Sequence, residues 1–251
     1  FKQGQAVGGF DAGIERALNE EIRQTAEPVA LSIDVRLQSI LRDRLKEHMD
    51  AYQAEGSAGL VMDVRTGEIL AMVSLPDFDP LKPSESLDMS RTNRLSNYLF
   101  EMGSTFKSFT TALALEHQHV RLSDRFDVTE PIRFSRHTIR DSHPAKRPLS
   151  VPEVFIYSSN VGTVRMAEYA GRDEQRRFYD ALGLLSPVPI ELPERTQPLF
   201  PDPWRDIHMM TLSYGHGMAV TPLHVARATA AIIGNGHLPD ITLRKREKHM
   251  G

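Results

Sequence analysis

Two short apolar runs joined by a four-residue connection place the strongest constraint on the fold of this 251-residue chain. The runs cover Gly59–Val64 and Ile69–Ser74, and the connection Arg65–Glu68 contains Gly67, which can adopt a positive φ without steric cost. Apolar runs around such a tight connection are typical of an antiparallel hairpin. We therefore expect these two strands to belong to a central antiparallel sheet.

A helical pattern precedes the hairpin. Val29–Ile33 resembles a short strand, and Asp34 is suited to cap the helix that follows, because its carboxylate can accept hydrogen bonds from free backbone N–H groups. Apolar residues then recur at spacings of three and four, which places them on one face of the helix. We expect this apolar stripe to belong to the core: Leu37, Ile40, Leu41, Leu45, Met49 and Tyr52.

Ser104 and Lys107 lie three positions apart, where Gly103 interrupts the preceding structure and a helix-favouring apolar run begins. On a helix the two side chains share a face, and the free N–H groups of a first helical turn stabilise a developing oxyanion. Lys107 could activate the Ser104 hydroxyl once desolvation or a second positive charge lowers the pKa of its amine. A Ser-x-x-Lys tetrapeptide occurs about once by chance in a chain of this length, so its context decides its meaning.

A second polar group, Ser158-Ser159-Asn160, lies between two helical segments, of which Pro152 opens the first. Ser158 and Asn160 are two positions apart on a short turn, so both side chains can point into one cleft. Ser158 could relay a proton from Lys107, and Asn160 could hold a substrate amide and the lysine. The alternative is that these polar side chains only cap the turn.

Two further segments have clear patterns. Thr221 as cap, Pro222 at the first helical position and the stop Gly234–Gly236 predict a late helix. The segment Arg133–Ser150 is rich in basic residues and is interpreted as a solvated loop or hairpin, with the wall of a binding cleft as the alternative. Its basic and histidine residues are Arg133, Arg136, His137, Arg140, His143, Lys146 and Arg147.

Composition excludes several functional classes. The net charge of −3 offers no global attraction to nucleic acid or to an anionic membrane, and we expect no nucleic-acid partner. The absence of cysteine excludes disulfides, thiolate metal sites and a cysteine nucleophile. His117 and His119 are two positions apart and would point to different sides of a helix, and no His-Glu-x-x-His sequence occurs. We therefore expect no metal and no cofactor.

Together, these features resemble the active-site serine penicillin-recognising superfamily, which is characterised by Ser-x-x-Lys, Ser-x-Asn and Lys-Ser/Thr-Gly motifs. Asp63–Met72, Phe100–Lys107, Tyr157–Gly162 and Tyr214–Gly217 occur in the order and approximate spacing of that family. The chain looks most similar to class B penicillin-binding proteins of the septal, cell-division type from Gram-negative bacteria. The resemblance covers nearly the whole chain from Val29 onward.

The resemblance implies a domain organisation. Residues 1–28 are similar to the end of a non-catalytic pedestal domain or a linker, and residues 29–251 are similar to the penicillin-binding transpeptidase domain. That fold is of the mixed α/β (α+β) class, with an antiparallel sheet flanked by helices on both faces. The chain would be the periplasmic part of an inner-membrane protein whose anchor lies outside these residues.

The implied activity is that of a serine-type peptidoglycan D,D-transpeptidase, which cross-links stem peptides during septal cell-wall synthesis and binds β-lactams covalently. Ser104 would attack the D-Ala-D-Ala carbonyl, Lys107 would be the base, Ser158 the proton relay, and Asn160 the anchor for substrate and lysine. Implied partners are stem peptides, β-lactams, a membrane glycan polymerase and divisome proteins. Further substrate contacts are implied for Tyr157, Ser159 and Gly217.

The third motif of the superfamily is missing from this sequence. None of its seven lysines is followed by Ser or Thr and then Gly. In the family this element binds the substrate carboxylate and supplies a second oxyanion donor. We therefore expect a chain truncated before its C-terminal strands, which acylates poorly or not at all, since one lost oxyanion donor costs about a hundredfold to a thousandfold in rate.

Two alternative functions fit the same residues. The first is a β-lactam-hydrolysing or β-lactam-sensing relative, which would need fast deacylation by water. No Glu-x-x-Leu-Asn element of the class A β-lactamase type follows Asn160. The second is a non-catalytic fragment that keeps the fold and serves in binding or assembly, and the missing third motif is its support.

Overall fold

The computed structural model describes residues 28–79, 82, 88–116 and 120–246. The chain forms two compact units. Within the described ranges, unit 1 contains residues 28–99, 186–197 and 221–246, and unit 2 contains residues 100–185 and 198–220. The predicted pedestal tail or linker, residues 1–28, falls almost entirely outside the described residues.

Unit 1 is built on the predicted hairpin. Strand β1 (Ser57–Met62) pairs with β2 (Ile69–Leu75) in antiparallel register, with Leu60 opposite Met72. The connecting turn requires Gly67, which has a φ of 74° and lies so close to residue 240 that a Cβ atom would be 2.3 Å from that residue's carbonyl oxygen. The hairpin prediction is confirmed.

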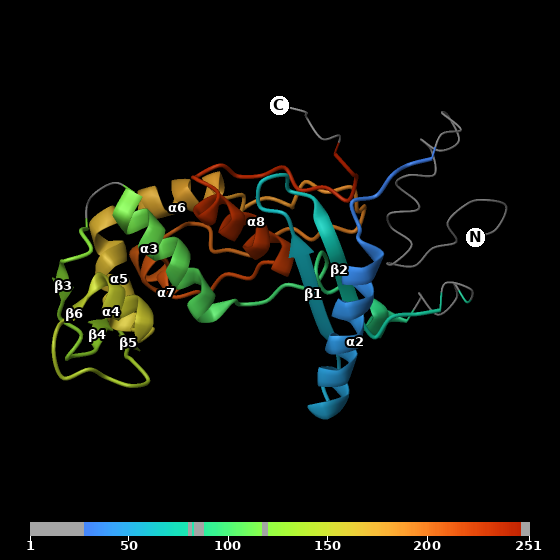
Figure 1. The fold of residues 1–251 in the computed structure, drawn as a ribbon. Coiled ribbons are helices and arrows are strands. Elements are labelled where there is room, and N and C mark those ends of the chain that lie inside the picture. The colour runs from blue at the N-terminus through green and yellow to red at the C-terminus, as the bar shows by residue number, and fades with distance from the viewer. Residues whose placement is uncertain (1–27, 80–81, 83–87, 117–119, 247–251) are drawn as a thin grey trace. The chain divides into compact units, whose positions relative to one another are not determined.

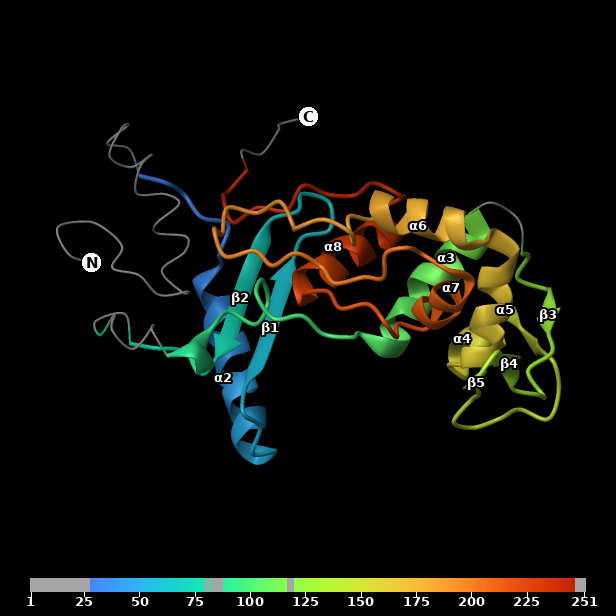
Figure 2. The ribbon, with the colours of Figure 1, turned by 180° about the vertical axis from the view of Figure 1, so that it is seen from behind.

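Helix α2 (Val35–Ala51) begins where the sequence predicts, because the Asp34 carboxylate accepts hydrogen bonds from the first free N–H groups. Figures 1 and 2 show α2 lying beside β1 and β2. The expectation that its apolar stripe belongs to the core is wrong: no residue of α2 is buried, and Ile40 is 59% exposed. Leu41 and Leu45 of the stripe lie against the hairpin at Gly59.

Helix α8 (Pro222–Ile233) also has its predicted bounds, with Thr221 as N-cap and Gly234 as C-cap. Its Leu223 belongs to the same apolar cluster as Ile69 of β2 and the partly buried Leu60 of β1. Because Gly59 and Leu60 are successive strand residues, they face opposite sides of the hairpin. Helices therefore flank both faces, as expected for the mixed α/β class.

The rest of unit 1 contains the short 3₁₀ helix η3 (Met89–Arg91) and irregular segments. The predicted strand at Val29–Ile33 is reduced to one isolated bridge, in which Leu31 pairs with Arg244. A second isolated bridge joins Glu68 to Thr242. The segment around residue 242 is therefore held to the hairpin by single backbone pairings.

Unit 2 is mostly helical and carries two small strand pairs. Its helices are η4 (Gly103–Phe106), α3 (Lys107–Glu116), α4 (Val151–Ile156), α5 (Asn160–Ala170), α6 (Arg172–Ala181) and α7 (Asp206–Ser213). Strand β3 (Arg125–Phe126) pairs with β6 (Leu149–Ser150), and β4 (Ile132–Phe134) pairs with β5 (His137–Ile139). The basic segment thus begins as a hairpin, as the main sequence interpretation predicted for its backbone, and its possible role as the wall of a binding cleft stays a prediction.

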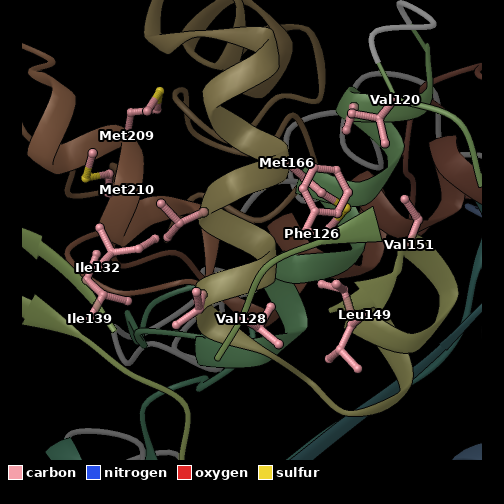
Figure 3. Packing of buried hydrophobic residues seen from close by; sticks show 14 residues of the cluster. Val120, Phe126, Val128, Ile132, Ile139, Leu149, Val151, Met166, Met209 and Met210 are labelled. Atoms are coloured by element: carbon pink, nitrogen blue, oxygen red, sulfur yellow. The ribbon is translucent and has the colours of Figure 1, made fainter. Parts of the chain in front are cut away.

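The core of unit 2 joins these strands to the helices. Figure 3 shows Phe126 of β3, Leu149 of β6 and Met166 of α5 among the apolar side chains of one cluster. Ile132 and Ile139 of the β4–β5 hairpin belong to the same cluster and are 6% and 5% exposed. The inner face of the β4–β5 hairpin therefore packs against the helices of unit 2.

Candidate active site

The Ser-x-x-Lys element forms the junction between η4 and α3, both in unit 2. Ser104 lies in the first turn, which is a 3₁₀ helix rather than the α-helical start that the sequence suggested, and α3 begins at Lys107. Phe106 and Phe109 are completely buried and fix this segment in the core. As a result, the Ser104 side chain is exposed while Lys107 is only 2% exposed.

A close approach between two glycines supports the nucleophile's turn. The Gly103 N–H donates to the Gly215 carbonyl oxygen at 3.1 Å. Gly215 has a φ of 80°, and a Cβ atom there would lie 1.9 Å from the Gly103 carbonyl oxygen. Any side chain at Gly215 would displace the backbone next to Ser104. This explains why the first glycine of the Tyr214–Gly217 sequence is needed there.

Hydrogen bonds connect the side chains of Lys107, Ser158 and Ser104, which the sequence predicted as site residues. The Lys107 amine donates to Ser158 Oγ at 2.8 Å and also contacts the Ser158 carbonyl oxygen. Ser158 Oγ lies 3.1 Å from Ser104 Oγ. The structure therefore brings the three side chains together, with Lys107 reaching Ser104 through Ser158.

The backbone of Ser158 makes this double contact with Lys107 possible. Ser158 has a φ of 52°, a left-handed conformation that is uncommon for a residue with a Cβ atom. In this conformation the hydroxyl and the carbonyl oxygen of one residue both face the same amine. A strained conformation in a polar cluster is a feature often found at functional sites.

This strain leads to a prediction for two variants that both lack the hydroxyl. Ser158→Ala keeps the cost of a Cβ atom at φ 52°, whereas Ser158→Gly removes it. We expect the glycine variant to be more stable than the alanine variant by about 1 kcal/mol in urea unfolding. Equal stability, or a more stable alanine variant, would show that the left-handed conformation carries no such cost.

Burial changes the protonation of Lys107. Desolvation lowers the pKa of its amine to about 8, although the negative charge of Asp141 acts in the opposite direction. An amine with this pKa is partly neutral near pH 8, whereas an ordinary lysine is almost fully protonated there. Lys107 can therefore accept a proton, which is the property that the sequence argument required of it.

Ser159 differs from its predicted role in substrate binding. Its side chain is 2% exposed, caps α5 by accepting the Gly162 N–H at 2.9 Å, and donates to the Asp141 carboxylate at 2.6 Å. A buried hydroxyl with both functions occupied is not available to a substrate. Ser159 instead ties the turn that carries Ser158 to Asp141.

Asp141 is the residue of this site that sequence reasoning missed. Besides Ser159 it accepts the Val161 N–H at 3.0 Å, so it holds the first turn of α5, and its charge acts on Lys107. Asp141 belongs to no motif and has no diagnostic spacing from Ser158. Its position directly after the basic hairpin was the only available signal, and it points to no particular role.

The other predicted site residues flank the serine turn. The Asn160 side-chain amide donates to the Arg140 carbonyl oxygen at 3.1 Å, so it anchors the basic segment where the sequence suggested a bond to the lysine. Tyr157, the C-cap of α4, is 60% exposed next to Ser158. Asn160 and Tyr157 therefore lie at the site, and their contact with a substrate stays a prediction.

Gly217 is hydrogen-bonded to the residues that lead into the nucleophile's turn. Its N–H donates to Glu101 Oε1 at 3.1 Å, and Glu101 Oε2 lies 2.9 Å from His216 Nδ1. The imidazole of His216 in turn stacks on the ring of Tyr214. Since the Gly217 N–H already has an acceptor, the predicted substrate contact would have to use another part of this glycine.

The chemistry of this arrangement is that of a serine nucleophile served by a buried amine through a second hydroxyl. In the described part of the chain, no group of three or more His, Asp or Glu side chains is placed to hold a metal ion. The same described residues contain no helix that is both long and apolar enough to cross a membrane.

Comparison with known proteins defines the class. The chain belongs to the family of the penicillin-binding protein transpeptidase domain, whose pattern matches residues 57–249. It is 41% identical to the probable peptidoglycan D,D-transpeptidase FtsI of Caulobacter vibrioides over 238 residues, which cover 93% of this chain and 40% of the relative. It is 33% identical to the peptidoglycan D,D-transpeptidase FtsI of Escherichia coli K12, with coverage of 88% and 38%.

Solved structures agree with this assignment. The chain resembles the transpeptidase domain of penicillin-binding protein 3 from Burkholderia pseudomallei, with a TM-score of 0.77, 30% identity and coverage of 87% of this chain and 62% of the other. A peptidoglycan glycosyltransferase from Burkholderia ambifaria gives a TM-score of 0.79 at 30% identity, with coverage of 88% and 67%. The chain spans about two fifths of the length of the curated relatives described above.

Proposed function

We propose that this chain carries the acylation centre of a peptidoglycan D,D-transpeptidase, with Ser104 as nucleophile, Lys107 as base and Ser158 as proton relay. The observation that carries this proposal is the hydrogen-bonded row from the buried Lys107 amine through Ser158 Oγ to the exposed Ser104 Oγ. Family membership and the names of the relatives, which describe peptidoglycan D,D-transpeptidases, support the substrate class.

Acylation starts with a neutral Lys107 amine. Hydroxyl hydrogens rotate freely, so Ser104 can donate to Ser158 while Ser158 donates to Lys107. Ser104 Oγ attacks the carbonyl carbon of the penultimate D-alanine, and its proton passes to Ser158 as the Ser158 proton passes to the lysine. The tetrahedral oxyanion that forms is stabilised by the backbone N–H of Ser104, since the Gly103 and Thr105 N–H groups already donate to the Gly215 and Met102 carbonyl oxygens.

Collapse of this intermediate completes the first half-reaction. The C–N bond to the terminal D-alanine breaks, and its nitrogen takes the proton back from Lys107 through Ser158. The products are free D-alanine and an ester on Ser104. An amine of a neighbouring stem peptide then attacks this ester, loses one proton through the same row, and leaves Ser104 protonated and the two peptides joined.

A β-lactam follows the first of these steps only. Ser104 attacks the lactam carbonyl, and the C–N bond of the ring breaks. The nitrogen then takes the proton from Lys107 through Ser158. The amine side of the broken bond remains tethered to the acyl group, so it does not diffuse away as D-alanine does. The ester on Ser104 therefore persists and can be detected as an increase in protein mass.

The family resemblance and the relatives also support proposals about the whole protein. We propose that residues 29–251 are part of its transpeptidase domain. Residues 1–28 would be the last part of a non-catalytic pedestal domain, or a linker. The site would act in the periplasm, on a protein anchored in the inner membrane. A glycan polymerase and divisome proteins would be its partners during septal cell-wall synthesis.

The pH dependence of acylation tests the proposed function. Since only the neutral Lys107 amine accepts a proton, the labelling rate should rise with pH and level off above the lysine pKa of about 8. Below it, the rate should fall by about tenfold for each pH unit. Benzylpenicillin labelling can be followed by intact mass and mapped to the Ser104 peptide, with spontaneous hydrolysis of the drug measured separately at each pH.

Two outcomes would contradict the proposal. An adduct that maps outside the Ser104 peptide would identify another nucleophile. A rate that is independent of pH from about pH 6 to about pH 9 would show that a lysine with a lowered pKa is not the base. Because the Lys-Ser/Thr-Gly motif is missing from the sequence, labelling should be followed over hours rather than seconds.

A further inference from the structure

The basic hairpin next to the site presents its arginines on its outer face. Arg133 of β4 lies opposite Thr138 of β5, and this pair lies between the Ile132–Ile139 and Phe134–His137 pairs. Because Ile132 and Ile139 point into the core, the alternation of a strand sends Arg133 and Thr138 outward. Arg140, two residues after Thr138, continues this outward row just past the end of β5.

Arg136 occupies the turn of the same hairpin, directly after Ser135, whose φ of 53° makes the turn tight. Arg133, Arg136 and Arg140 are all exposed, and we call them the outer basic face. The side chains come from one short hairpin whose inner face is fixed in the core. Arg133 therefore lies within a strand, and Arg136 and Arg140 lie directly beside the two strands of the same hairpin.

The outer basic face has no acidic partner within the described part of the chain. By contrast, the neighbouring Arg147 pairs with Glu153 at 2.7 Å, so its charge is already compensated. The stretch from residue 132 to residue 147 contains five Lys or Arg residues and a single acidic residue, Asp141, whereas the whole chain has a net charge of −3. A local excess of positive charge on a weakly acidic protein is a feature expected of a surface that attracts an anionic ligand.

This face is directly connected to the candidate active site. The Arg140 carbonyl oxygen accepts the Asn160 amide at 3.1 Å, and the next residue, Asp141, holds Ser159 and the Val161 N–H. All three contacts lie within unit 2, as do Ser104 and Lys107. A chain bound along the outer basic face would therefore be held next to the turn that carries Ser158.

We propose that the outer basic face binds an internal carboxylate of the peptide substrate, upstream of its D-Ala-D-Ala end. This inference rests on the proposed function and adds a subsite to it. Arginine suits this task, because its planar guanidinium can donate two parallel hydrogen bonds to one carboxylate. The subsite would select peptides that carry a negative charge upstream of the reacting bond and would orient them before Ser104 attacks.

A cycle of two peptides and two proteins tests the subsite. One fluorescent peptide ends in D-Ala-D-Ala and has a glutamate upstream, and the second differs only by glutamine in that position. The variant combines Arg133→Gln, Arg136→Gln and Arg140→Gln, which remove charge from exposed positions without creating a buried cavity. Binding of both peptides to both proteins is measured by fluorescence anisotropy, and thermal unfolding checks that the variant remains folded.

The unsubstituted chain should bind the glutamate peptide about tenfold more tightly than the glutamine peptide, because hydrogen bonds from an arginine to a charged carboxylate are stronger than those to a neutral amide. The triple variant should bind both peptides equally. The preference should also shrink as salt rises from about 0.05 M to about 0.5 M, since exposed charges are screened. Arg121→Gln, an exposed arginine of unit 2 outside the hairpin, is the matched control and should keep the preference.

Several results would overturn the subsite. These are no preference in the unsubstituted chain, no measurable binding of either peptide, the same preference in the triple variant, or an equal loss in Arg121→Gln. Covalent labelling of Ser104 by penicillin separates the two proposals. Labelling at Ser104 without a glutamate preference removes only the subsite, whereas an adduct that maps to another residue removes the proposed function itself.

Discussion

Replacing Ser104 with alanine is expected to abolish covalent labelling by penicillin while leaving the fold intact. The hydroxyl is the only group of the Lys107–Ser158–Ser104 row that is both exposed and at the end of the proton path. Its loss removes the bond-forming atom, so neither a longer incubation nor a higher pH should restore labelling. Intact mass after overnight incubation measures the outcome directly.

The stability of this variant should barely change. Ser104 is exposed, and its hydroxyl takes part in a single hydrogen bond, so its removal should cost less than about 1 kcal/mol. Ser108→Ala is the matched control, because that hydroxyl lies one helical turn further along and bonds only the Thr105 carbonyl oxygen at 2.6 Å. Ser108→Ala should still be labelled, and persistent labelling of Ser104→Ala would show that another residue is the nucleophile.

Replacing Gly215 with alanine should have the largest effect on stability. The new Cβ atom would lie 1.9 Å from the Gly103 carbonyl oxygen and 2.6 Å from the Gly103 carbonyl carbon. Both are backbone atoms, so no side-chain rotation can relieve the clash. Together with the cost of a φ of 80°, we expect a loss of about 3 kcal/mol or more in urea unfolding.

Gly103→Ala provides a matched control on the other side of the same contact. Gly103 also has a positive φ, of 54°, yet a Cβ atom there would meet nothing within 4 Å. Its substitution should therefore cost only the conformational penalty of about 1 kcal/mol. Gly215→Ala should in addition slow the labelling of Ser104, since it displaces the residue before the nucleophile. Equal losses of stability in Gly215→Ala and Gly103→Ala would show that the backbones of Gly215 and Gly103 do not approach each other this closely.

Local signals allowed several parts of the fold to be predicted. The cap at Asp34, the stop after α8 at Gly234 and the turn at Gly67 depend on the conformations and hydrogen bonds of a few neighbouring residues. The Ser-x-x-Lys and Ser-x-Asn sequences likewise located the polar groups that the structure brings together. Such features are visible in the sequence because their causes lie within one or two turns.

Burial was harder to predict, because it depends on what packs against an element. The stripe of α2 has an apolar spacing that fits a core helix, yet no residue of α2 is buried and Ile40 is 59% exposed. Ser159 shows the same problem in the site. Its place in a motif suggested a substrate contact, whereas its buried side chain caps α5 and bonds Asp141.

The sequence by itself determined which groups are available for chemistry in this protein: a serine and a lysine at the start of a helix, and a second serine on a turn. Only the tertiary structure decided how they are connected. The left-handed backbone of Ser158 directs two oxygens at Lys107, and burial lowers the pKa of that amine. Both effects arise from residues far apart in the chain, because desolvation and hydrogen-bond geometry depend on neighbours in space rather than in sequence.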